Sequence, residues 1–231
     1  MSVCTPKSFD LTGKVALITG ASYGIGFAIA TAMANCGATI VFNDIKQELV
    51  DKGLAAYKEA GIEAHGYVCD VTNEDAVNEM VKKITAEVGH INVLVNNAGV
   101  ALFGLFDALP KDEVQKLYSV NLTGTVELCR LFLPQMLRRK SGCIVNVSSV
   151  WGTTGASCEV DYSASKAAVA GLTRALAREV GPSGVRVNCV APGVIDTDMN
   201  GRLTYEEMLA LTDEIPLMRL GTAEEAAEAI F

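Results

Sequence analysis

The chain has 231 residues, half of them hydrophobic and a fifth charged, with a formal net charge of −8. This length and composition suit one large α/β domain with a sizeable core. The acidic balance and the lack of a basic stripe argue against nucleic acid as a partner. The N-terminus lacks the apolar core of a signal peptide, and no apolar run is long enough to cross a membrane, so we expect a cytoplasmic protein.

Cysteines and histidines bear on the compartment and on metals. No two cysteines are spaced Cys-x-x-Cys, and most lie in apolar stretches, where a free thiol behaves as a small hydrophobe; they are Cys4, Cys36, Cys69, Cys129, Cys143, Cys158 and Cys189. This pattern favours a reducing compartment without a disulfide framework. His65 and His90 are far apart and have no cysteine cluster nearby, so we expect no metal site.

Along the chain, short apolar runs alternate with longer helical patterns. The runs are almost continuously apolar and rich in Val and Ile, as expected of strands buried on both faces; they cover 14–20, 39–44, 64–71, 91–99, 143–149 and 185–193. Helical spacing follows the first run at Ile25, Ile29 and Met33, and a later helix stops at Gly181-Pro182. The alternation predicts a parallel sheet with helices on both faces, whose ligands bind at the carboxyl ends of the strands.

The first strand is followed by "TGASYGIG", from Thr19 to Gly26. Its glycines allow a sharp turn and a close approach to a pyrophosphate, and the next helix would offer its unpaired N–H groups. A glycine-rich loop alone is equally compatible with a simple turn. The strand before it and the helix after it favour a dinucleotide phosphate loop.

The second strand ends in Asp44, eighteen residues after Gly26. A carboxylate at this distance can accept hydrogen bonds from adenosine ribose hydroxyls and would repel a 2′-phosphate, which favours NAD over NADP. NADP remains possible as the cofactor, because Lys46 and Tyr23 lie close enough in sequence to soften the repulsion. Asp44 could also be a solvated loop carboxylate or a cap on the helix that starts near Lys46.

Tyr162 and Lys166 lie four residues apart in "DYSASKAAVAG", so on a helix they share one face. A tyrosine hydroxyl can protonate a carbonyl oxygen while a nicotinamide reduces the carbon, and an adjacent ammonium stabilises the phenolate. Lowering the tyrosine pKa from about 10 by about three units requires about 4 kcal/mol, which a close, partly desolvated cation can supply. Alone, the pair is well explained by chance; the phosphate loop, Asp44 and a serine at a strand end favour the catalytic interpretation.

With these motifs, the sequence resembles the short-chain dehydrogenase/reductase family over nearly its whole length. Residues 19–26 resemble the family's cofactor loop, 96–99 its "NNAG" element, which supports the central sheet, and Tyr162-x-x-x-Lys166 its catalytic pair. Ser149 lies thirteen residues before Tyr162, the usual spacing of the family's serine, so we prefer it to Ser148.

The resemblance implies a set of site residues. The catalytic ones are Asn121, Ser149, Tyr162 and Lys166, with Asn121 helping to hold a water-mediated proton relay to the lysine. The cofactor-binding ones are Gly20, Ser22, Tyr23, Gly24, Ile25, Gly26, Asp44, Asp70, Val71, Asn97, Ala98, Gly99, Tyr162, Lys166, Pro192, Gly193, Val194, Ile195 and Thr197. Asp70 would lie beside the adenine, and 192–197 would embrace the nicotinamide and diphosphate.

The resemblance also implies a metal-independent, NAD(P)-dependent oxidoreductase that interconverts a carbonyl and a secondary alcohol, on a doubly wound Rossmann-type sheet, commonly in tetramers. Family members usually continue beyond the point where this chain stops, at "AEEAAEAIF", into a seventh strand. We therefore expect residues 1–231 to form one dinucleotide-binding catalytic domain, truncated at its C-terminus, with six strands. The expected homo-oligomer is a dimer or a tetramer.

The two halves of the chain resemble different subgroups. Through Gly99 the sequence resembles gluconate 5-dehydrogenases, and beyond it 3-oxoacyl-acyl-carrier-protein reductases. Because 101–105, 151–160 and 195–211 would form most of the substrate wall, we favour a 3-oxoacyl or similar carbonyl substrate. Arg202 is the one evident basic residue there, which leaves an anionic sugar acid without a clamp.

Further alternatives stay open. The basic run 138–140 could meet an acidic acyl carrier protein or be a solvated helix end. A sugar-acid dehydrogenase is the second candidate function. The third is a cofactor-binding protein that lacks turnover.

Overall fold

A parallel sheet of six strands forms the centre of the computed structural model, which describes residues 9–201 and 204–230. The strand order is β3-β2-β1-β4-β5-β6, where the strands are β1 (Val15–Thr19), β2 (Thr39–Asp44), β3 (Ala64–Val68), β4 (Val93–Asn96), β5 (Gly142–Val147) and β6 (Val185–Val190). The order reverses between β1 and β4, and at such a point the carboxyl ends of the strands leave a crevice for ligands. The predicted six-stranded Rossmann-type sheet is confirmed.

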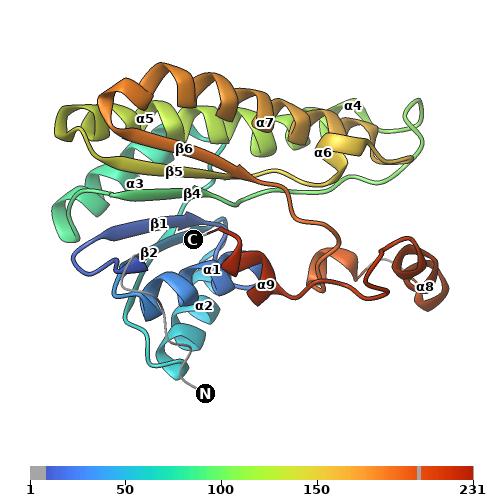
Figure 1. Ribbon diagram of the computed structural model, residues 1–231, viewed down its shortest axis with the longest axis horizontal. Coiled ribbons are helices and arrows are strands. Elements are labelled where there is room, and N and C mark those ends of the chain that lie inside the picture. The colour runs from blue at the N-terminus through green and yellow to red at the C-terminus, as the bar shows by residue number, and fades with distance from the viewer. Residues whose placement is uncertain (1–8, 202–203, 231) are drawn as a thin grey trace.

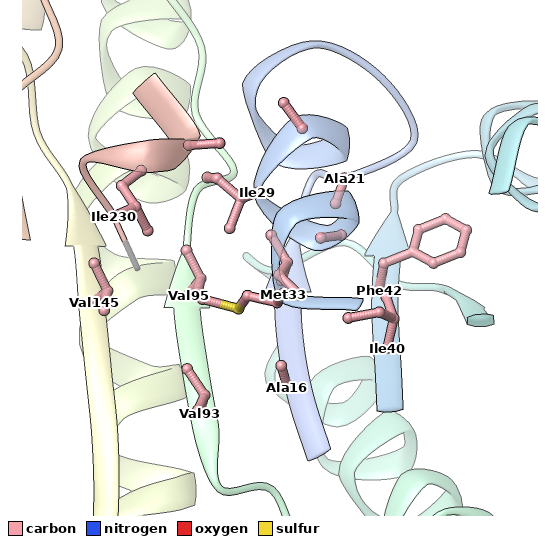
Figure 2. Close-up of a cluster of buried hydrophobic side chains, with 14 of the residues drawn as sticks. Ala16, Ala21, Ile29, Met33, Ile40, Phe42, Val93, Val95, Val145 and Ile230 are labelled. Atoms are coloured by element: carbon pink, nitrogen blue, oxygen red, sulfur yellow. The ribbon is translucent and has the colours of Figure 1, made fainter. Parts of the chain in front are cut away.

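Helices cover both faces of this sheet (Figure 1). One face carries α1 (Gly24–Asn35), α2 (Gln47–Glu59) and α9 (Ala223–Glu228); the other carries α3 (Glu74–Glu87), α5 (Thr125–Arg139) and α7 (Val160–Val180). Figure 2 shows the first face, where Ile29 and Met33 of α1 and Ile230 pack over the valines of β4 and β5. Burial of each such side chain contributes about 1.5–3 kcal/mol, so the apolar strands and amphipathic helices specify this layering together.

Shorter elements gather near the carboxyl end of the sheet. They are α4 (Lys111–Tyr118), a π-helical turn η2 (Ser119–Gly124), α6 (Trp151–Thr154), the 3-10 turn η4 (Asp198–Asn200) and α8 (Tyr205–Asp213). The 3-10 turn η3 (Gly181–Ser183) lies at the opposite end of the sheet, directly before β6. After β6 the chain extends away from the sheet through η4 and α8 and then returns to α9 (Figure 1). A single parallel bridge between Ile195 and Gly221 joins the two ends of this excursion. We call residues 196–220 the flap segment.

Several strands are shorter at their carboxyl ends than the sequence predicted. Residues 69–71, 97–99 and 191–193 follow β3, β4 and β6 but leave the hydrogen-bonded ladder. Asp70, Asn97 and Pro192 bond to neighbouring loops and side chains instead, and these stretches shape the edge of the sheet where the site lies. Helix α7 ends at Val180, as predicted, because Pro182 lacks the N–H that would continue it.

Among the residues that the structure describes, no helix has both the length and the apolar character that a membrane crossing requires. The same residues contain no cluster of three or more His, Cys, Asp or Glu side chains able to hold a metal ion. The described cysteines are all free thiols, and Cys4 lies outside the described residues.

Candidate active site

A cleft of about 590 Å³ opens at the carboxyl ends of the central strands. Its floor and walls come from loops after β4, β5 and β6, from the start of α7 and from the flap segment. Of the residues predicted from the sequence, those lining it are Ile25, Asn97, Gly99, Ser149, Tyr162, Lys166, Pro192, Gly193, Val194, Ile195 and Thr197. The fold therefore brings together segments that are far apart in the sequence.

The glycine-rich loop beside the cleft has the backbone that a phosphate loop requires. Gly20 and Gly24 have φ of 63° and 61°, a region that side chains disfavour. A Cβ on Gly26 would lie 2.5 Å from the Gly20 carbonyl oxygen, so this position admits only glycine. Helix α1 begins with no side-chain cap and no acidic residue in its first turn, which leaves its N–H groups available to an anion.

Two side chains outside the glycine motif hold this loop. Tyr57 of α2 is fully buried and donates from Oη to the Ala21 carbonyl at 2.7 Å. Asn97 donates from Nδ2 to the carbonyls of Thr19 and Gly20, both at 3.0 Å. Ser22 Oγ, in contrast, is buried without a hydrogen-bond partner among the described residues. An unpaired hydroxyl beside uncapped amides fits the diphosphate of a dinucleotide.

Asp44 lies at the end of β2, and its side chain is buried. Its Oδ1 accepts from the N–H of Ile45 at 2.9 Å. Helix α2 starts after Lys46 and has no side-chain cap, so Asp44 does not cap this helix. Because Asp44 is buried, it is not a solvated loop carboxylate either. Burial and then the charge of Asp44 raise the pKa of Tyr23, so these two side chains lie close enough to interact.

Asp70 and Val71 follow β3 and shape the neighbouring loop. Asp70 Oδ1 accepts from the N–H of Thr72 at 2.9 Å and from its hydroxyl at 2.8 Å, which closes a tight turn. Val71 is buried against Gly124 of η2, where a Cβ would lie 3.0 Å from the Val71 carbonyl oxygen. Neither Asp70 nor Val71 lines the cleft itself. Both follow the carboxyl end of β3, which lies beside the carboxyl end of β2.

Tyr162 and Lys166 stand one turn apart on α7, with the lysine Nζ 5.8 Å from the centre of the tyrosine ring. The Lys166 side chain is 5% exposed, and its Nζ donates to the Val147 carbonyl at 2.9 Å. Burial lowers the pKa of Lys166 to about 8, and the neighbouring Cys189 partly opposes this shift. The ammonium form therefore predominates at neutral pH, where it can stabilise a phenolate.

The two serines after β5 have different partners. Ser148 Oγ donates to the Lys166 carbonyl at 2.7 Å, so this hydroxyl fastens α7 to the end of β5. Ser149 Oγ accepts from the N–H of Trp151 at 3.2 Å, which leaves its proton to be donated into the cleft. This geometry favours Ser149 as the hydroxyl that meets a substrate.

Asn121 is buried in the π-helical turn η2, behind the cleft wall. Its Oδ1 accepts from the Val100 N–H at 2.8 Å, and its Nδ2 donates to the Val100 carbonyl at 2.9 Å and to Ser165 Oγ at 3.1 Å. Ser165 in turn donates to the Tyr162 carbonyl at 2.7 Å. Asn121 thus links the loop after β4 to the turn of α7 that carries Tyr162.

Sequence reasoning missed three side chains that hold the site. Tyr57 supports the glycine loop, Ser165 joins Asn121 to α7, and Thr19 Oγ1 accepts from the N–H groups of Asn97 and Ala98 at 3.1 and 2.9 Å. Thr19 belonged to the recognised loop motif, and Ser165 lies between Tyr162 and Lys166, so both had a local signal. Tyr57 had none, because its partner is 36 residues away.

The outer part of the cleft mixes apolar and acidic side chains. The apolar ones are Ala101, Phe103, Trp151, Met199, Ala210 and Leu211, and the acidic ones are Glu159, Glu207 and Glu214. Among the described residues that line the cleft, Lys166 is the only basic one. Arg202, which the sequence pointed to, lies outside the described residues.

Comparison with known proteins gives the family. The family model for short chain dehydrogenases matches residues 14–208. The chain belongs to the short-chain dehydrogenase family. The resemblance read from the motifs is thus confirmed, and this short-chain dehydrogenase is an NAD(P)-dependent oxidoreductase.

Relatives of this short-chain dehydrogenase fall into both predicted subgroups. It is 39% identical to a 3-oxoacyl-acyl-carrier-protein reductase of Thermotoga maritima, over 95% of this chain and 89% of that protein. A reductase of the same name from Pseudomonas aeruginosa is 40% identical, over 96% and 90%. A gluconate 5-dehydrogenase from Burkholderia cenocepacia, solved with NADP and tartrate, has a TM-score of 0.90 at 32% identity, over 96% and 88%.

The lowered pKa of Lys166 predicts a pH dependence of stability. Because the lysine titrates near 8 in the folded state and near 10.5 in the unfolded state, the unfolded chain binds more protons between these values, and the free energy of unfolding rises with pH there. Urea titrations should show the wild type gaining up to about 3 kcal/mol over Lys166→Met across this window. Parallel curves for the two proteins would contradict a buried lysine with a lowered pKa.

Proposed function

We propose that this short-chain dehydrogenase reduces a 3-oxoacyl or similar carbonyl substrate, with Tyr162 as the proton donor. The observation that carries the proposal is the meeting of two hydroxyls, Tyr162 and Ser149, in one cleft above a buried lysine amine. Lys166 and Asn121 complete the proposed catalytic set.

The proposed cofactor is NAD, held by the glycine loop, the first turn of α1 and Asp44, with NADP as the alternative. The orphan hydroxyl of Ser22 and the uncapped amides of α1 support a diphosphate there. Asp70 and Val71 would flank the adenine, and Ile195 and Thr197, which line the cleft, would hold the nicotinamide end. When bound, the nicotinamide supplies the hydride that reduces the carbonyl carbon.

The chain's own groups then handle the oxygen. Ser149 donates a hydrogen bond to the carbonyl oxygen and polarises it. Tyr162 donates its hydroxyl proton to the same oxygen, and the Lys166 ammonium stabilises the phenolate that remains. Asn121, through Ser165 and Val100, holds the loop after β4 and the start of α7 at a fixed separation.

The cleft wall supports an uncharged acyl chain as the substrate. Phe103, Trp151 and Leu211 offer apolar surface, while Glu207 and Glu214 disfavour a carboxylate. Glu207 is held by both the N–H and the hydroxyl of Thr204, which lower its pKa and keep it anionic. The reductase relatives support the same choice. A sugar-acid substrate remains the second candidate because of the likeness to gluconate 5-dehydrogenase.

An acyl carrier protein is the proposed carrier of the acyl chain during reduction, because of the names of the reductase relatives. Within one protomer, the basic run 138–140 lies too far from the cleft to support binding of this partner there. It ends α5 just before β5, whose six residues separate it from the cleft by about 20 Å, and Arg139 Nη2 donates to the Ile91 carbonyl at 2.6 Å. The proposed setting is a cytoplasmic homo-oligomer, a dimer or tetramer of a single catalytic domain.

A substrate panel tests this function. Purified protein is mixed with NADH or NADPH and with acetoacetyl-N-acetylcysteamine, a neutral thioester; the reverse reaction uses gluconate with NAD or NADP. We expect loss of NAD(P)H absorbance with the thioester. Oxidation of gluconate alone would favour the sugar-acid reading instead. Cofactor binding without turnover of any substrate would identify a binding protein.

Replacement of Tyr162 by phenylalanine tests its role as the acid. Tyr162→Phe removes only the hydroxyl, so turnover should fall by about 10²–10⁴-fold while the cofactor dissociation constant changes little. Steady-state rates and NADH fluorescence titration measure the two. Tyr67→Phe, which deletes a hydroxyl bound to Glu87 far along the sheet, is the control and should keep the full rate. Substantial residual turnover in Tyr162→Phe would rule this tyrosine out.

Asp44 tests the cofactor preference. Asp44→Asn removes the charge that repels a 2′-phosphate, so the affinity for NADP relative to NAD should rise about tenfold, equivalent to about 1.4 kcal/mol. Fluorescence titrations with NADH and NADPH give the ratio. Asp51→Asn on α2 makes the same change in net charge at an exposed position and should leave the ratio unchanged. An unaltered ratio in Asp44→Asn would show that the carboxylate does not meet the ribose.

A further inference from the structure

The π-helical turn η2 joins α4 to α5 and sets the position of Asn121. A π-turn is wider than an α-turn and occurs frequently at functional sites. Here it lets the Asn121 amide reach both Val100 and Ser165, on two different segments of the chain. The contact between η2 and α7 therefore determines the position of Asn121 relative to Tyr162.

A second hydrogen bond joins α7 to the chain just before η2. Tyr118, the last residue of α4 before η2, donates from Oη to Oδ1 of Asp161 at 3.1 Å. Asp161 is buried, lies in the first turn of α7 and immediately precedes Tyr162. Burial, together with the hydrogen bond to Asp161, raises the pKa of Tyr118, so its hydroxyl stays a donor through the working pH range.

We infer that Tyr118 is a positioning residue for this enzyme: through Asp161 it holds the first turn of α7, and with it Tyr162, at a fixed distance from Asn121. The inference rests on the proposed catalytic role of Tyr162. Tyr118 does not line the cleft and need not touch substrate or cofactor. Its effect is transmitted because Tyr118 and Asn121 share one short backbone stretch, as do Asp161 and Tyr162.

The two bridges differ in what they fix. The Asn121–Ser165 bond ends on a side chain in the second turn of α7, three residues after Tyr162, and Ser165 donates back to the Tyr162 carbonyl within the helix. The Tyr118–Asp161 bond ends on the residue directly before Tyr162, so it fastens the first turn and opposes a rotation of α7 there. Loss of the Tyr118 hydroxyl should therefore misdirect the Tyr162 hydroxyl while the cofactor loop, on the far side of the cleft, stays as it was.

The experiment compares three variants in the full-length protein. Tyr118→Phe should lower kcat about tenfold and leave KM for the cofactor unchanged. Asp161→Asn keeps an oxygen that accepts from Tyr118 and should retain at least half of kcat, whereas Asp161→Ala should match Tyr118→Phe. The double variant Tyr118→Phe/Asp161→Ala should be no slower than either single variant, because both remove one interaction.

Hydrogen–deuterium exchange provides a readout that does not require turnover. In Tyr118→Phe, exchange should rise in 119–124 and 159–166 and remain unchanged elsewhere, including 19–26. Tyr67→Phe, which also deletes a tyrosine–carboxylate hydrogen bond, is the matched control. It should change neither the rate nor the exchange of these two segments.

Each outcome decides the matter. If Tyr118→Phe behaves like Tyr67→Phe in rate and in exchange, or if the losses of the two single variants multiply in the double variant, Tyr118 has no positioning role. If the wild type shows no turnover with any substrate, the proposed function fails, and the exchange pattern alone then supports or overturns the role of Tyr118 in holding α7 to η2.

Discussion

A lysine amine buried beneath an open cleft is the constraint on which the site depends. Lys166 reaches this position because two neighbours lack side chains: a Cβ on Gly99 would lie 3.3 Å from its Nζ, and one on Gly152 would lie 2.8 Å from its carbonyl carbon. Burial disfavours the ammonium, and the Val147 carbonyl partly offsets this by accepting from it. The close packing of α6, α7 and the loop after β4 thus holds this one cation in place.

Beneath the cleft, a row of polar side chains crosses two neighbouring strands, β4 and β5, and ends on α7. Asn96 of β4 donates to Asn146 of β5 at 2.8 Å, and Asn146 donates to Thr173 of α7 at 2.9 Å. Asn96 and Asn146 are direct partners in the strand register. A slip of one residue would turn Asn146 to the other face of the sheet and break both bonds, so this row specifies the register at the point where the reactive groups must line up.

Much of this arrangement could be predicted from local patterns in the sequence. Apolar runs and helical spacing were enough for the six-stranded sheet, because each pattern lies within one element. The glycine loop and the Tyr162–Lys166 turn were found for the same reason. Strand ends were placed too late, since 97–99 and 191–193 bond to loops rather than to the ladder. The Tyr118–Asp161 and Asn121–Ser165 bonds were missed because their partners lie 43 and 44 residues apart, and no spacing rule connects them.

The flap segment leaves the body of the molecule after Ile195 and rejoins it at Gly221, where a single bridge brings its two ends together. It supplies Met199, Ala210 and Leu211 to the outer wall, and of the proposed site residues it carries only Thr197. An excursion attached in this way is interchangeable beyond that residue: a replacement that keeps Thr197 and whose ends meet at the same spacing would leave the sheet and α7 undisturbed. Diversification of such proteins toward new molecules to reduce can therefore proceed by swapping one stretch of chain while the chemistry is inherited intact.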